Sequence, residues 1–424
     1  MEKYYIEGGF PVSGSIVASG NKNAILPAIA AVVLTDQAVT LRNVPDIEDV
    51  QVMLKVFEAF GGTVKQLEKN TLQLQLKDLK SYEVPAEFAT KIRASILFAG
   101  PLLARCGKAI LPPPGGDVIG RRRLDTHFLA LQELGAKIET RDTFCFEAKN
   151  IAGSDLFLDE ASVTATENAI MLAVLAKGST TITNAACEPH VQDLCNLLIA
   201  MGAVISGVGS NVLHIQGVNS LKGTEFEIGP DYMEIGSFIG LAVATKGELT
   251  IEKIKPADMR PLVPAFKKLG VTFNIERTNL TVPRSQSLKV NTDFGGMIPK
   301  IDDSPWPGFP ADLTSIMTVL ATQVSGTVLI HEKMFESRMF FVDKLIGMGA
   351  AITLCDPHRA VVSGPSKLHG SPLVSPDVRA GMAMLIAASC AEGKSVISNI
   401  YQIDRGYENL AERLRSIGVQ IEKK

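Results

Sequence analysis

The stretch ELGAKI at 133–138 ends a predicted helix with Gly135 and opens a predicted strand directly after it. A helix commonly ends in a left-handed residue, a conformation that glycine adopts without a clash of a Cβ atom. Five further stretches follow the same pattern: AFGGTV at 59–64, AMGAVI at 200–205, KLGVTF at 268–273, GMGAAI at 347–352 and SIGVQI at 416–421. The glycines recur roughly every 70 residues, which favours one structural unit repeated six times over six unrelated helix ends.

Within each unit the sequence predicts a strand, a loop, an amphipathic helix, the glycine, another strand and a second helix rich in small residues. The second helices, for example at 169–178 and 383–393, are apolar on nearly all faces and should be buried inside a ring of sheets. The charged segment 408–418 should lie on the outside instead. Three units per domain predict two similar α/β globules, and the best junction lies near 227–238.

Composition favours a globular enzyme of two domains. The chain has 424 residues, of which 46% are hydrophobic and 21% are charged, so it can bury more than one core. A net charge of -3 gives no general attraction to nucleic acid or to anionic membranes. The N-terminal stretch lacks the pattern of a secretion signal, and the longest apolar run, 24–34, is far short of a bilayer span. A cytoplasmic protein is therefore expected.

Several common site motifs are absent from the sequence. There is no GxxxxGK[ST] loop, and SGVGSN at 206–211 has the wrong spacing for a dinucleotide loop. There is no HExxH motif, and the six histidines are never spaced at i, i+4, which disfavours a metal hydrolase. The six cysteines show no CxxC spacing and are expected to be reduced, buried side chains.

Cations at loop positions remain as candidates for holding anions. In SGNKNA at 19–24, Lys22 and Asn23 open an apolar helix, which combines a side-chain charge with a helix N-terminus. Arg93 in KIRASI opens another helix of small residues. Either cation could instead be an ordinary surface charge.

The stretch PPPGGDVIGRRRLDTH at 112–127 is more specific. Two glycines predict a mobile loop, Asp117 stands in that loop, and three arginines at 121–123 follow before the next helix. A solvated basic turn is the competing interpretation.

The C-terminal half offers a matching set. WPGFPAD at 306–312 places Asp312 after a loop constrained by proline and glycine, although Asp312 could also be the N-cap of the apolar helix that follows. Further loop charges are Arg338 in FESR, Asp377 and Arg379 in PDVRAG, and Asp404 and Arg405 in IDRGYE. Neighbouring Asp and Arg residues could form weak surface ion pairs, but so many loop charges in both halves favour a site for anions.

Taken together, these motifs resemble the UDP-N-acetylglucosamine 1-carboxyvinyltransferase family, the MurA-type enolpyruvyl transferases of bacterial peptidoglycan synthesis. The resemblance covers essentially the full chain and rests on SGNKNAILP, KIRAS, PPGGDVIGRRRLDTH, NAACEPHVQDL, GFPADL, FESRM, DVRAG and IDRGYE, in that order. The enolpyruvyl transferase of the shikimate pathway shares the six-unit architecture and stays open as an alternative. Asn23 and the loop around Asp117 resemble the sugar-nucleotide enzyme more closely.

The resemblance implies a two-domain inside-out α/β barrel of the enolpyruvyl transferase type, with six repeated βαβαββ-type units. One domain would span residues 22–230 and carry a lid loop at 112–123. The other would combine residues 1–21 with 231–424, and the active site would lie in the cleft between the domains. Closure of that cleft should follow nucleotide binding.

The resemblance also implies the reaction. The 3-hydroxyl of UDP-N-acetylglucosamine would attack C2 of phosphoenolpyruvate while C3 is protonated, and the tetrahedral ketal would then expel phosphate. This transferase reaction is the first committed step of peptidoglycan biosynthesis, which links the protein to cell wall biogenesis, cell shape, the cell cycle and cell division. The resemblance implies no metal and no organic cofactor. The expected partners are the two small substrates, with no nucleic acid and no membrane. The protein is expected to be a cytoplasmic monomer.

Residue roles carry over position by position. The catalytic set would be Asp117, Lys22, Asp312 and Arg405. Phosphoenolpyruvate carries a phosphate and a carboxylate, so it needs several fixed cations. The residues implied for it are Lys22, Asn23, Arg122, Arg338, Arg379 and Arg405, with Lys22, Arg122 and Arg405 on the phosphate. The residues implied for UDP-N-acetylglucosamine are Arg93, Arg122, Arg123, Leu124, Asp125, Thr126, Ser162, Val163, Thr164, Asp312 and Met334. Asp312 would accept or orient the attacking hydroxyl.

Position 117 departs from the commoner pattern of the family, which has Cys in the lid loop, while a minority of members carry Asp. A carboxylic acid can donate a proton if it is protonated when substrate is bound. Neighbouring arginines oppose that protonation, whereas lid closure and bound anions favour it, and the sequence leaves both open. Because fosfomycin inactivates the common form by alkylating the lid Cys, Asp117 predicts a fosfomycin-insensitive variant.

Two other classes of function remain. A catalytically silent relative that binds the sugar nucleotide as a regulator would not need Lys22, Asp312 and Arg405, and all three are present. A purely structural repeat protein would need none of the loop arginines and would bind no nucleotide sugar.

Overall fold

The computed structural model describes residues 2–117, 119–284 and 286–424. The chain forms two compact units. Unit 1 comprises Met1–Ser19, Val118–Arg122 and Pro230–Lys424, and unit 2 comprises Gly20–Asp117 and Arg123–Gly229. The second half of the predicted lid loop, Val118–Arg122, thus groups with unit 1, and position 118 itself lies outside the described residues.

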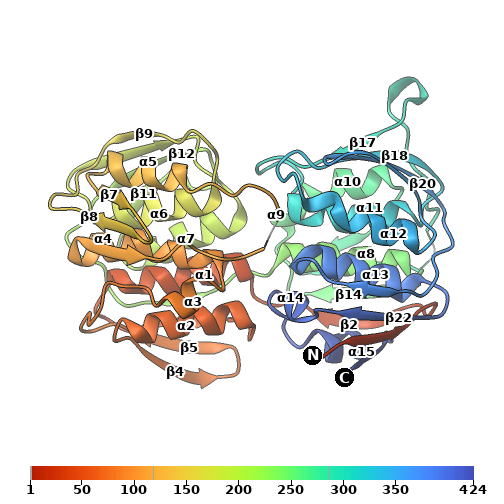
Figure 1. The fold of residues 1–424 in the computed structure, drawn as a ribbon, viewed down its shortest axis with the longest axis horizontal. Coiled ribbons are helices and arrows are strands. Elements are labelled where there is room, and N and C mark those ends of the chain that lie inside the picture. Colours follow the sequence, from red (N-terminus) through yellow and green to blue (C-terminus); the bar gives the residue numbers. More distant parts are fainter. Residues whose placement is uncertain (1, 118, 285) are drawn as a thin grey trace. The chain divides into compact units, whose positions relative to one another are not determined.

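Unit 1 contains three four-stranded sheets among its described residues (Figure 1). The first has the order β21 (Pro372–Val374), β22 (Lys394–Ser398), β1 (Tyr4–Glu7), β23 (Gln420–Lys423). The second has the order β15 (Asn274–Glu276), β16 (Asn279–Val282), β14 (Glu248–Glu252), β2 (Ser13–Val17). The third has the order β17 (Lys300–Asp302), β18 (Gly326–His331), β20 (Arg359–Gly364), β19 (Ala351–Asp356).

Unit 2 also has three sheets in its described part. Two are four-stranded. The first has the order β11 (Val204–Ser206), β12 (Val212–Gln216), β10 (Ser179–Thr183), β9 (Asp155–Phe157). The second has the order β13 (Glu225–Glu227), β3 (Val39–Arg42), β5 (Thr71–Gln75), β4 (Thr63–Glu68). The third is three-stranded, with the order β6 (Lys108–Leu111), β8 (Phe144–Glu147), β7 (Lys137–Thr140). A parallel bridge from Glu83 to Ile110 stands where the other sheets have a fourth strand.

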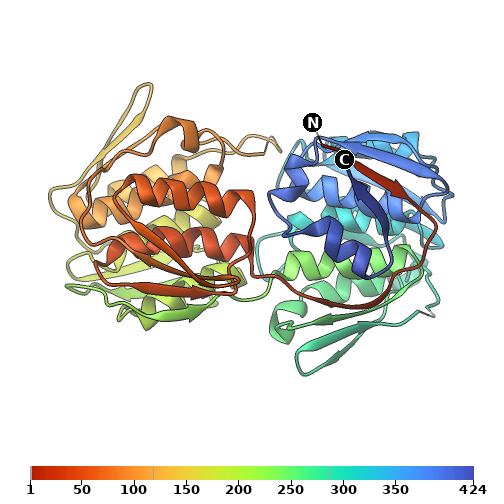
Figure 2. The same ribbon diagram turned by 90° about the horizontal axis from the view of Figure 1, so that it is seen from below.

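The six sheets share one pattern of strand directions. In each four-stranded sheet, three neighbouring strands run antiparallel to one another, and the fourth strand lies at one edge and runs parallel to its neighbour. The strand β21 is parallel to β22 in this way, and β9 is parallel to β10. The first strand of unit 1, β1, lies between β22 and β23 and is antiparallel to both (Figure 2). The two ends of the chain therefore complete the same sheet.

Helices that are mostly buried lie between the sheets of each unit (Figure 1). In unit 1 these are α8 (Tyr232–Ala244), α11 (Thr314–Ala321) and α13 (Val378–Cys390), which pack against one another. In unit 2 they are α1 (Lys22–Ala31), α4 (Ala99–Cys106) and α6 (Val163–Ala173), which meet around the 3₁₀ helix η2 (Arg93–Phe98). Every residue of α8 is buried, and so is every residue of α13 except Cys390. The predicted buried helices are confirmed for 169–173 in α6 and for 383–389 in α13, but both helices begin earlier and end earlier than predicted.

Amphipathic and short helices connect these elements. The longer ones are α2 (Glu48–Ala59), α5 (Asp125–Glu133), α7 (Pro189–Ala200), α10 (Leu262–Lys268) and α15 (Leu410–Ser416). The short ones are η1 (Val32–Leu34), α3 (Ala86–Ala89), α9 (Pro256–Met259), η3 (Phe294–Gly296), η4 (Ala311–Leu313), η5 (Arg338–Phe341), α12 (Val342–Gly347) and α14 (Tyr401–Asp404). In α15 only Leu410, Ala411 and Leu414 are buried, as expected for a helix with a solvated face.

All six glycines that end the predicted repeats have positive φ angles: Gly61 at 97°, Gly135 at 103°, Gly202 at 103°, Gly270 at 73°, Gly349 at 102° and Gly418 at 98°. The left-handed conformation that the sequence pattern predicts is thus confirmed at every one of them. No helix among the described residues is both long enough and apolar enough to cross a bilayer.

The expectation for the cysteines is only partly correct. Cys187 and Cys195 are buried, but Cys106 and Cys355 are exposed. Cys106 is the last residue of α4, and Cys355 lies on the outward side of β19, where alternate residues face away from the core. All six are free thiols.

Candidate functional site

Lys22 and Asn23 open helix α1 of unit 2, as predicted. Asn21 is the N-cap, and its side chain accepts a hydrogen bond of 2.8 Å from the backbone nitrogen of Asn23. Lys22 is buried, and its Nζ lies 2.7 Å from Oδ2 of the buried Asp49 on α2. The alternative of an exposed surface lysine is therefore wrong, because Asp49 holds the ammonium group at the positive end of the helix.

The residues predicted for the nucleotide lie together in unit 2. Nη2 of Arg93 donates a hydrogen bond of 2.8 Å to the backbone oxygen of Arg123. Leu124 is the N-cap of α5, and the hydroxyl of Thr126 in its first turn donates to Oδ1 of Asp159 at 2.7 Å. Asp159 precedes Ser162, the N-cap of α6. The first turns of α5 and α6 thus stand side by side, with Asp125 and Val163 as their first residues.

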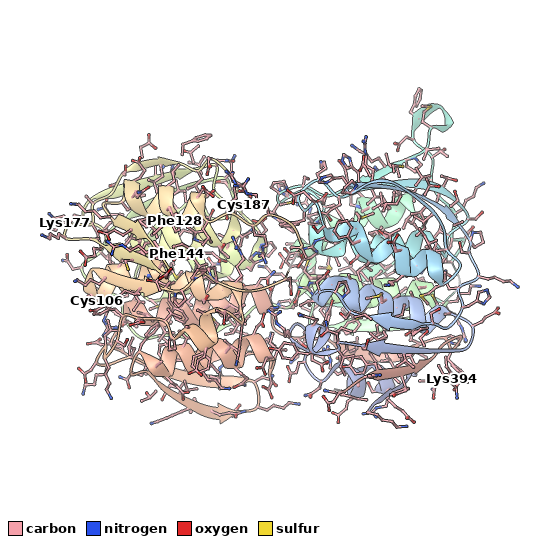
Figure 3. The ribbon with its side chains drawn as sticks, viewed as in Figure 1. Cys106, Phe128, Phe144, Lys177, Cys187 and Lys394 are labelled. Carbon is pink, nitrogen blue, oxygen red and sulfur yellow. The ribbon has the colours of Figure 1, made fainter. Side chains whose placement is uncertain are left out.

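Two further contacts fix these helix starts. The rings of Phe128 on α5 and Phe144 on β8 meet edge to face, with centroids 5.2 Å apart (Figure 3). Between α5 and α6, Nε2 of His127 lies 3.0 Å from Oγ1 of Thr164. His127 was not predicted as a site residue, although the family motif ends on it.

The predicted lid loop needs its glycines. A Cβ atom at Gly115 would lie 1.8 Å from the backbone oxygen of Thr90, so only glycine fits there. Gly120 has a φ of 134°, and a Cβ atom on it would lie 2.2 Å from Oε2 of Glu336. Beside it, the backbone nitrogen of Arg121 donates to the same carboxylate at 3.2 Å. The segment 119–121 therefore packs, within unit 1, on the stretch that leads to Arg338.

The other residues of this loop differ in their surroundings. Asp117, in unit 2, and Arg122, in unit 1, are half-buried, and Arg123 is exposed with its Nε 4.0 Å from Oδ2 of Asp125.

A group of buried charges in unit 1 surrounds Asp312. Nη2 of Arg338 donates to Oδ1 of Asp312 at 2.9 Å, and Nε of Arg379 donates to Oδ2 at 3.0 Å. Both arginines are buried. The guanidinium of Arg338 also stacks over the ring of Phe335, with its Cζ 5.0 Å from the centroid. Each carboxylate oxygen thus has its own charged donor.

The alternative role of Asp312 as a helix N-cap is wrong. Helix α11 has Leu313 as its N-cap, without a capping side chain, and Asp312 lies in the 3₁₀ turn η4 before it. Burial alone would raise the pKa of Asp312, but Arg338 and Arg379 outweigh that effect and hold it well below its usual range. Asp312 is therefore an ionised carboxylate.

Three residues that sequence reasoning missed complete this cluster. Nη1 of Arg379 donates to the hydroxyl of Tyr407 at 3.1 Å, and that hydroxyl lies 3.1 Å from Oγ of Ser237. Nη2 of Arg379 lies 3.9 Å from Oδ2 of Asp231, the N-cap of α8. The only signal in the sequence was the Tyr in IDRGYE. Asp377 is the N-cap of α13 and holds the backbone of Arg379 in place at 2.8 Å.

Two buried acids, Asp303 and Glu332, lie together, and Glu332 is close enough to Arg338 to interact with its charge. Oδ1 and Oδ2 of Asp303 accept hydrogen bonds from the backbone nitrogens of Lys333, at 2.5 Å, and Met334, at 3.2 Å. Glu332 is fully buried beside Asp303, and burial raises its pKa to about 9, even though Arg338 acts in the opposite direction. Met334 itself is exposed.

Arg405 is the C-cap of α14 and is buried. Its Nη1 donates to Oε1 of Gln402 on the same helix at 2.9 Å. The helix is tied to the first strand, because the hydroxyl of Tyr4 on β1 donates to Oδ1 of Asp404.

Comparison with known proteins identifies the class of fold. The chain matches the family described as EPSP synthase (3-phosphoshikimate 1-carboxyvinyltransferase) over residues 6–414. It is similar in fold to the enolpyruvyl transferase NikO from Streptomyces tendae, with a TM-score of 0.88 and 23% identity over 100% of this chain and 99% of that chain. EPSP synthase from Acinetobacter baumannii gives a TM-score of 0.77 and 17% identity, with 100% of both chains covered. The molecule has the mixed α/β fold of the enolpyruvyl transferases.

Curated relatives narrow this class. Proteins named UDP-N-acetylglucosamine 1-carboxyvinyltransferase are 70% identical in Treponema denticola and 67% identical in Treponema pallidum, with 100% of each chain covered. The protein of that name in Bradyrhizobium diazoefficiens is 54% identical over 99% of this chain and 98% of its own length. The chain belongs to the UDP-N-acetylglucosamine 1-carboxyvinyltransferase family.

Proposed function

We propose that this protein transfers the enolpyruvyl group of phosphoenolpyruvate to the 3-hydroxyl of UDP-N-acetylglucosamine and releases phosphate. The observation that carries the proposal is the arrangement around Asp312. An ionised carboxylate stands between two buried arginines, and Nε of Arg338 is a buried donor without a hydrogen-bond partner in the described part of the chain. A buried donor of this kind is costly unless a ligand or water accepts from it, and the carboxylate of phosphoenolpyruvate is a suitable acceptor.

The low pKa of Asp312 defines its role in this reaction. A carboxylate that two arginines keep ionised is a weak base but a strong hydrogen-bond acceptor. Asp312 would therefore orient the sugar 3-hydroxyl by accepting its hydrogen bond and take the proton as the new C–O bond forms. Charge that develops in the transition state would be stabilised by Arg338 and Arg379, which are already fixed in position.

The remaining roles follow the chemistry of addition and elimination. The hydroxyl oxygen bonds to C2 of phosphoenolpyruvate while Asp117 delivers a proton to C3. In the second step the carboxylate of Asp117 takes a proton back from C3, and the bond from C2 to the phosphate oxygen breaks with its electrons leaving on phosphate, which regenerates the double bond. Lys22, Arg122 and Arg405 would hold the departing phosphate, and Asn23 would contact phosphoenolpyruvate. Asp49 supports this role of Lys22 because it fixes the ammonium group at a helix N-terminus.

The nucleotide would be held mainly by unit 2. The proposed residues are Arg93, Arg123, Leu124, Asp125, Thr126, Ser162, Val163 and Thr164, together with Arg122 and Met334 of unit 1. Support comes from the adjacent first turns of α5 and α6, whose N–H groups suit an anionic ligand. The assignment requires residues of both units to act on the same substrates, with loop 112–123 as a lid. The proposed domains are residues 22–230 on the one hand and residues 1–21 with 231–424 on the other.

We also infer that the six sheets are six copies of one βαβαββ-type unit, arranged as an inside-out barrel with the helices inside. The shared strand directions of the sheets and the six left-handed glycines support the repeat. The buried helices of both units support the inside-out arrangement.

The test is phosphate release from phosphoenolpyruvate by the purified protein. Release should require UDP-N-acetylglucosamine, and mass spectrometry should find the enolpyruvyl ether of the sugar nucleotide. Release with shikimate 3-phosphate in its place would identify the other enolpyruvyl transferase reaction. Tight nucleotide binding without any release would indicate a regulatory relative, and no nucleotide binding would indicate a structural protein.

For its place in the cell the proposal follows the family: a cytoplasmic monomer that acts at the first committed step of peptidoglycan biosynthesis. Depletion of the protein should cause accumulation of UDP-N-acetylglucosamine and loss of cell shape. Light scattering and cell fractionation would test the monomer and its location.

A further inference from the structure

A buried hydrogen-bond chain links three side chains in unit 2. Nδ2 of Asn168 on α6 lies 3.0 Å from Nδ1 of His127. The other ring nitrogen of His127, Nε2, lies 3.0 Å from Oγ1 of Thr164. Asn168 and His127 are almost completely buried, while Thr164 is half-buried at the second position of α6. The chain therefore runs from the interior of unit 2 to the start of α6.

The direction of every bond in this chain can be determined. The backbone nitrogen of Gly100 can only donate, and it lies 2.9 Å from Oδ1 of Asn168. The backbone oxygen of Ile96 can only accept, and it lies 2.9 Å from Nδ2. The Asn168 amide thus has one possible orientation, and its Nδ2–H group donates to Nδ1 of His127. Burial, assisted by nearby Arg93, lowers the pKa of His127 to about 3, so the ring is neutral. A neutral ring that accepts at Nδ1 carries its proton on Nε2 and donates to Thr164.

Thr164 is left with one unused donor. A threonine hydroxyl has one proton and two acceptor positions, and one of these positions receives the proton of His127. No other hydrogen bond of the Thr164 side chain occurs among the described residues. Its own proton must therefore point to solvent or to a ligand.

The surroundings of this proton favour an anionic acceptor. Helix α6 has 11 residues, and the N–H groups of its first turn have no partner within the helix. These groups carry the positive end of the helix dipole. The guanidinium of Arg93 adds positive charge close enough to act on His127. A diphosphate oxygen fits these donors better than a neutral carbonyl does.

We infer that Asn168 and His127 are positioning residues that keep Thr164 as a hydrogen-bond donor to the diphosphate of the sugar nucleotide. The inference rests on the proposed function only in taking a uridine diphosphate as the ligand. It predicts selectivity for ligands that place an anionic oxygen at the start of α6.

Calorimetry with UDP and with uridine tests the Thr164 donor. Thr164→Val should weaken UDP binding about tenfold or more, because a hydrogen bond to a charged acceptor is lost. Thr164→Ser keeps the hydroxyl and should remain within about threefold of the unmodified protein. Uridine, which lacks phosphate, should bind equally to the Val variant and the unmodified protein. The matched control is Thr181→Val, which removes another threonine–histidine contact of 3.2 Å on β10 of the same unit and should change nothing.

Three results would overturn the inference. The first is unchanged UDP binding by Thr164→Val, and the second is an equal loss of uridine affinity in that variant. The third is an equal loss of UDP affinity in Thr164→Ser, which would indicate that the methyl group of Thr164 matters and not its hydroxyl.

Nitrogen NMR of the protein labelled with ¹⁵N-histidine tests the positioning role directly. His127 should show the tautomer with the proton on Nε2 in the free protein, and should stay neutral at about pH 5. Asn168→Asp offers only acceptors to Nδ1, so it should move the ring proton to Nδ1. Thr164 would then donate to His127, and UDP binding should weaken as it does in Thr164→Val. A proton on Nδ1 in the unmodified protein would overturn the inference.

These outcomes are separable from a failure of the proposed function. If the expected tautomer and the expected losses of UDP affinity are found, but the protein releases no phosphate from phosphoenolpyruvate, the inference about the nucleotide site stands and the proposed reaction is wrong. If the protein releases phosphate normally but Thr164→Val binds UDP as tightly as the unmodified protein, the proposed reaction stands and the inference about Thr164 is wrong.

Discussion

At the scale of single residues, the chemistry proposed for unit 1 depends on how Asp312 is held. Its two oxygens each accept from a different buried arginine, so the carboxylate is fixed in orientation as well as in charge. Charge-assisted bonds of this kind are roughly twice as strong as neutral ones. Asp312 does not cap α11, because it lies inside the 3₁₀ turn η4 and its side chain binds the two arginines instead.

Asp312→Asn tests the role of this charge. The amide keeps the shape of the side chain but cannot accept from both arginines or take a proton, so turnover should fall by roughly 100-fold or more. Nucleotide affinity should change little, because most of the proposed nucleotide contacts lie in unit 2. Stability should fall by up to about 3 kcal/mol, because two buried arginines lose a counter-charge. Steady-state kinetics and thermal unfolding measure the two effects.

The control for this variant is Asp356→Asn on β19 of the same unit, which removes the half-buried carboxylate that pairs with the exposed Arg359 and should leave turnover unchanged. Turnover of Asp312→Asn within a few-fold of the unmodified protein would contradict the proposed role of the charge.

Asp117 sets the expected response to an epoxide inhibitor. A thiolate is a strong nucleophile, whereas a carboxylic acid that donates a proton is neutral at the decisive moment. The unmodified protein should therefore turn over in the presence of fosfomycin without progressive inactivation. Asp117→Cys should become sensitive and gain mass on the peptide that contains residue 117, while Asp117→Ala should lose turnover and stay unmodified.

Peptide mapping is needed in this experiment because Cys106 and Cys355 are exposed. Modification of a native cysteine together with loss of activity in the unmodified protein would show that the proton donor has been assigned to the wrong loop.

At the scale of elements, the segment after β18 combines a buried acid with the substrate contacts proposed for Met334 and Arg338. Asp303 holds the backbone of residues 333 and 334, and Glu332 lies fully buried against it. A pKa of about 9 means that Glu332 keeps its proton in the folded protein at neutral pH. The segment therefore avoids two negative charges in one buried place.

This proton makes stability depend on pH. The unfolded chain releases the Glu332 proton above about pH 4.3, but the folded protein holds it up to about pH 9, so stability should fall as the pH rises through this range. The slope that one proton contributes is about 1.4 kcal/mol per pH unit. Glu332→Gln copies the protonated form and should flatten the dependence between about pH 6 and pH 8.5.

Urea unfolding at several pH values measures this slope. Glu412→Gln changes an exposed glutamate on α15 and should leave the slope as it is. Equal slopes for Glu332→Gln and the unmodified protein would mean that Glu332 is ionised in the folded state.

At the scale of the whole molecule, the proposed function requires residues of both units to act on one pair of substrates. The residues proposed for the nucleotide are mostly in unit 2, whereas Asp312 and its arginines belong to unit 1. Trp306, the only tryptophan, also belongs to unit 1 and packs edge to face on Tyr232, with ring centroids 5.4 Å apart. It lies in the loop that leads to Asp312.

Trp306 should therefore report on nucleotide binding. Addition of UDP-N-acetylglucosamine alone should change its emission, because the loop 303–312 must adjust when the sugar reaches Asp312. Fluorescence titration and calorimetry should give the same dissociation constant, and Trp306→Phe should abolish the optical signal but retain the heat. Constant emission at nucleotide concentrations where calorimetry shows binding would contradict a joint action of the two units.

The sequence by itself determined the local features of this protein. The six left-handed glycines, the buried helices and the position of Lys22 at the start of α1 follow from backbone sterics and from the spacing of apolar residues, which act over a few positions. The family motifs likewise lie in short continuous stretches, and they named most of the candidate site residues.

Only the tertiary structure decided how those residues are held. Asp312 meets arginines that are 26 and 67 positions away, and the hydroxyl of Tyr407 reaches Ser237 across 170 positions. The burial of Glu332 and the direction of the bond from His127 to Thr164 also depend on contacts between distant segments. Charge state and hydrogen-bond direction depend on burial and on the partners present, and both arise only when segments far apart in the chain pack together.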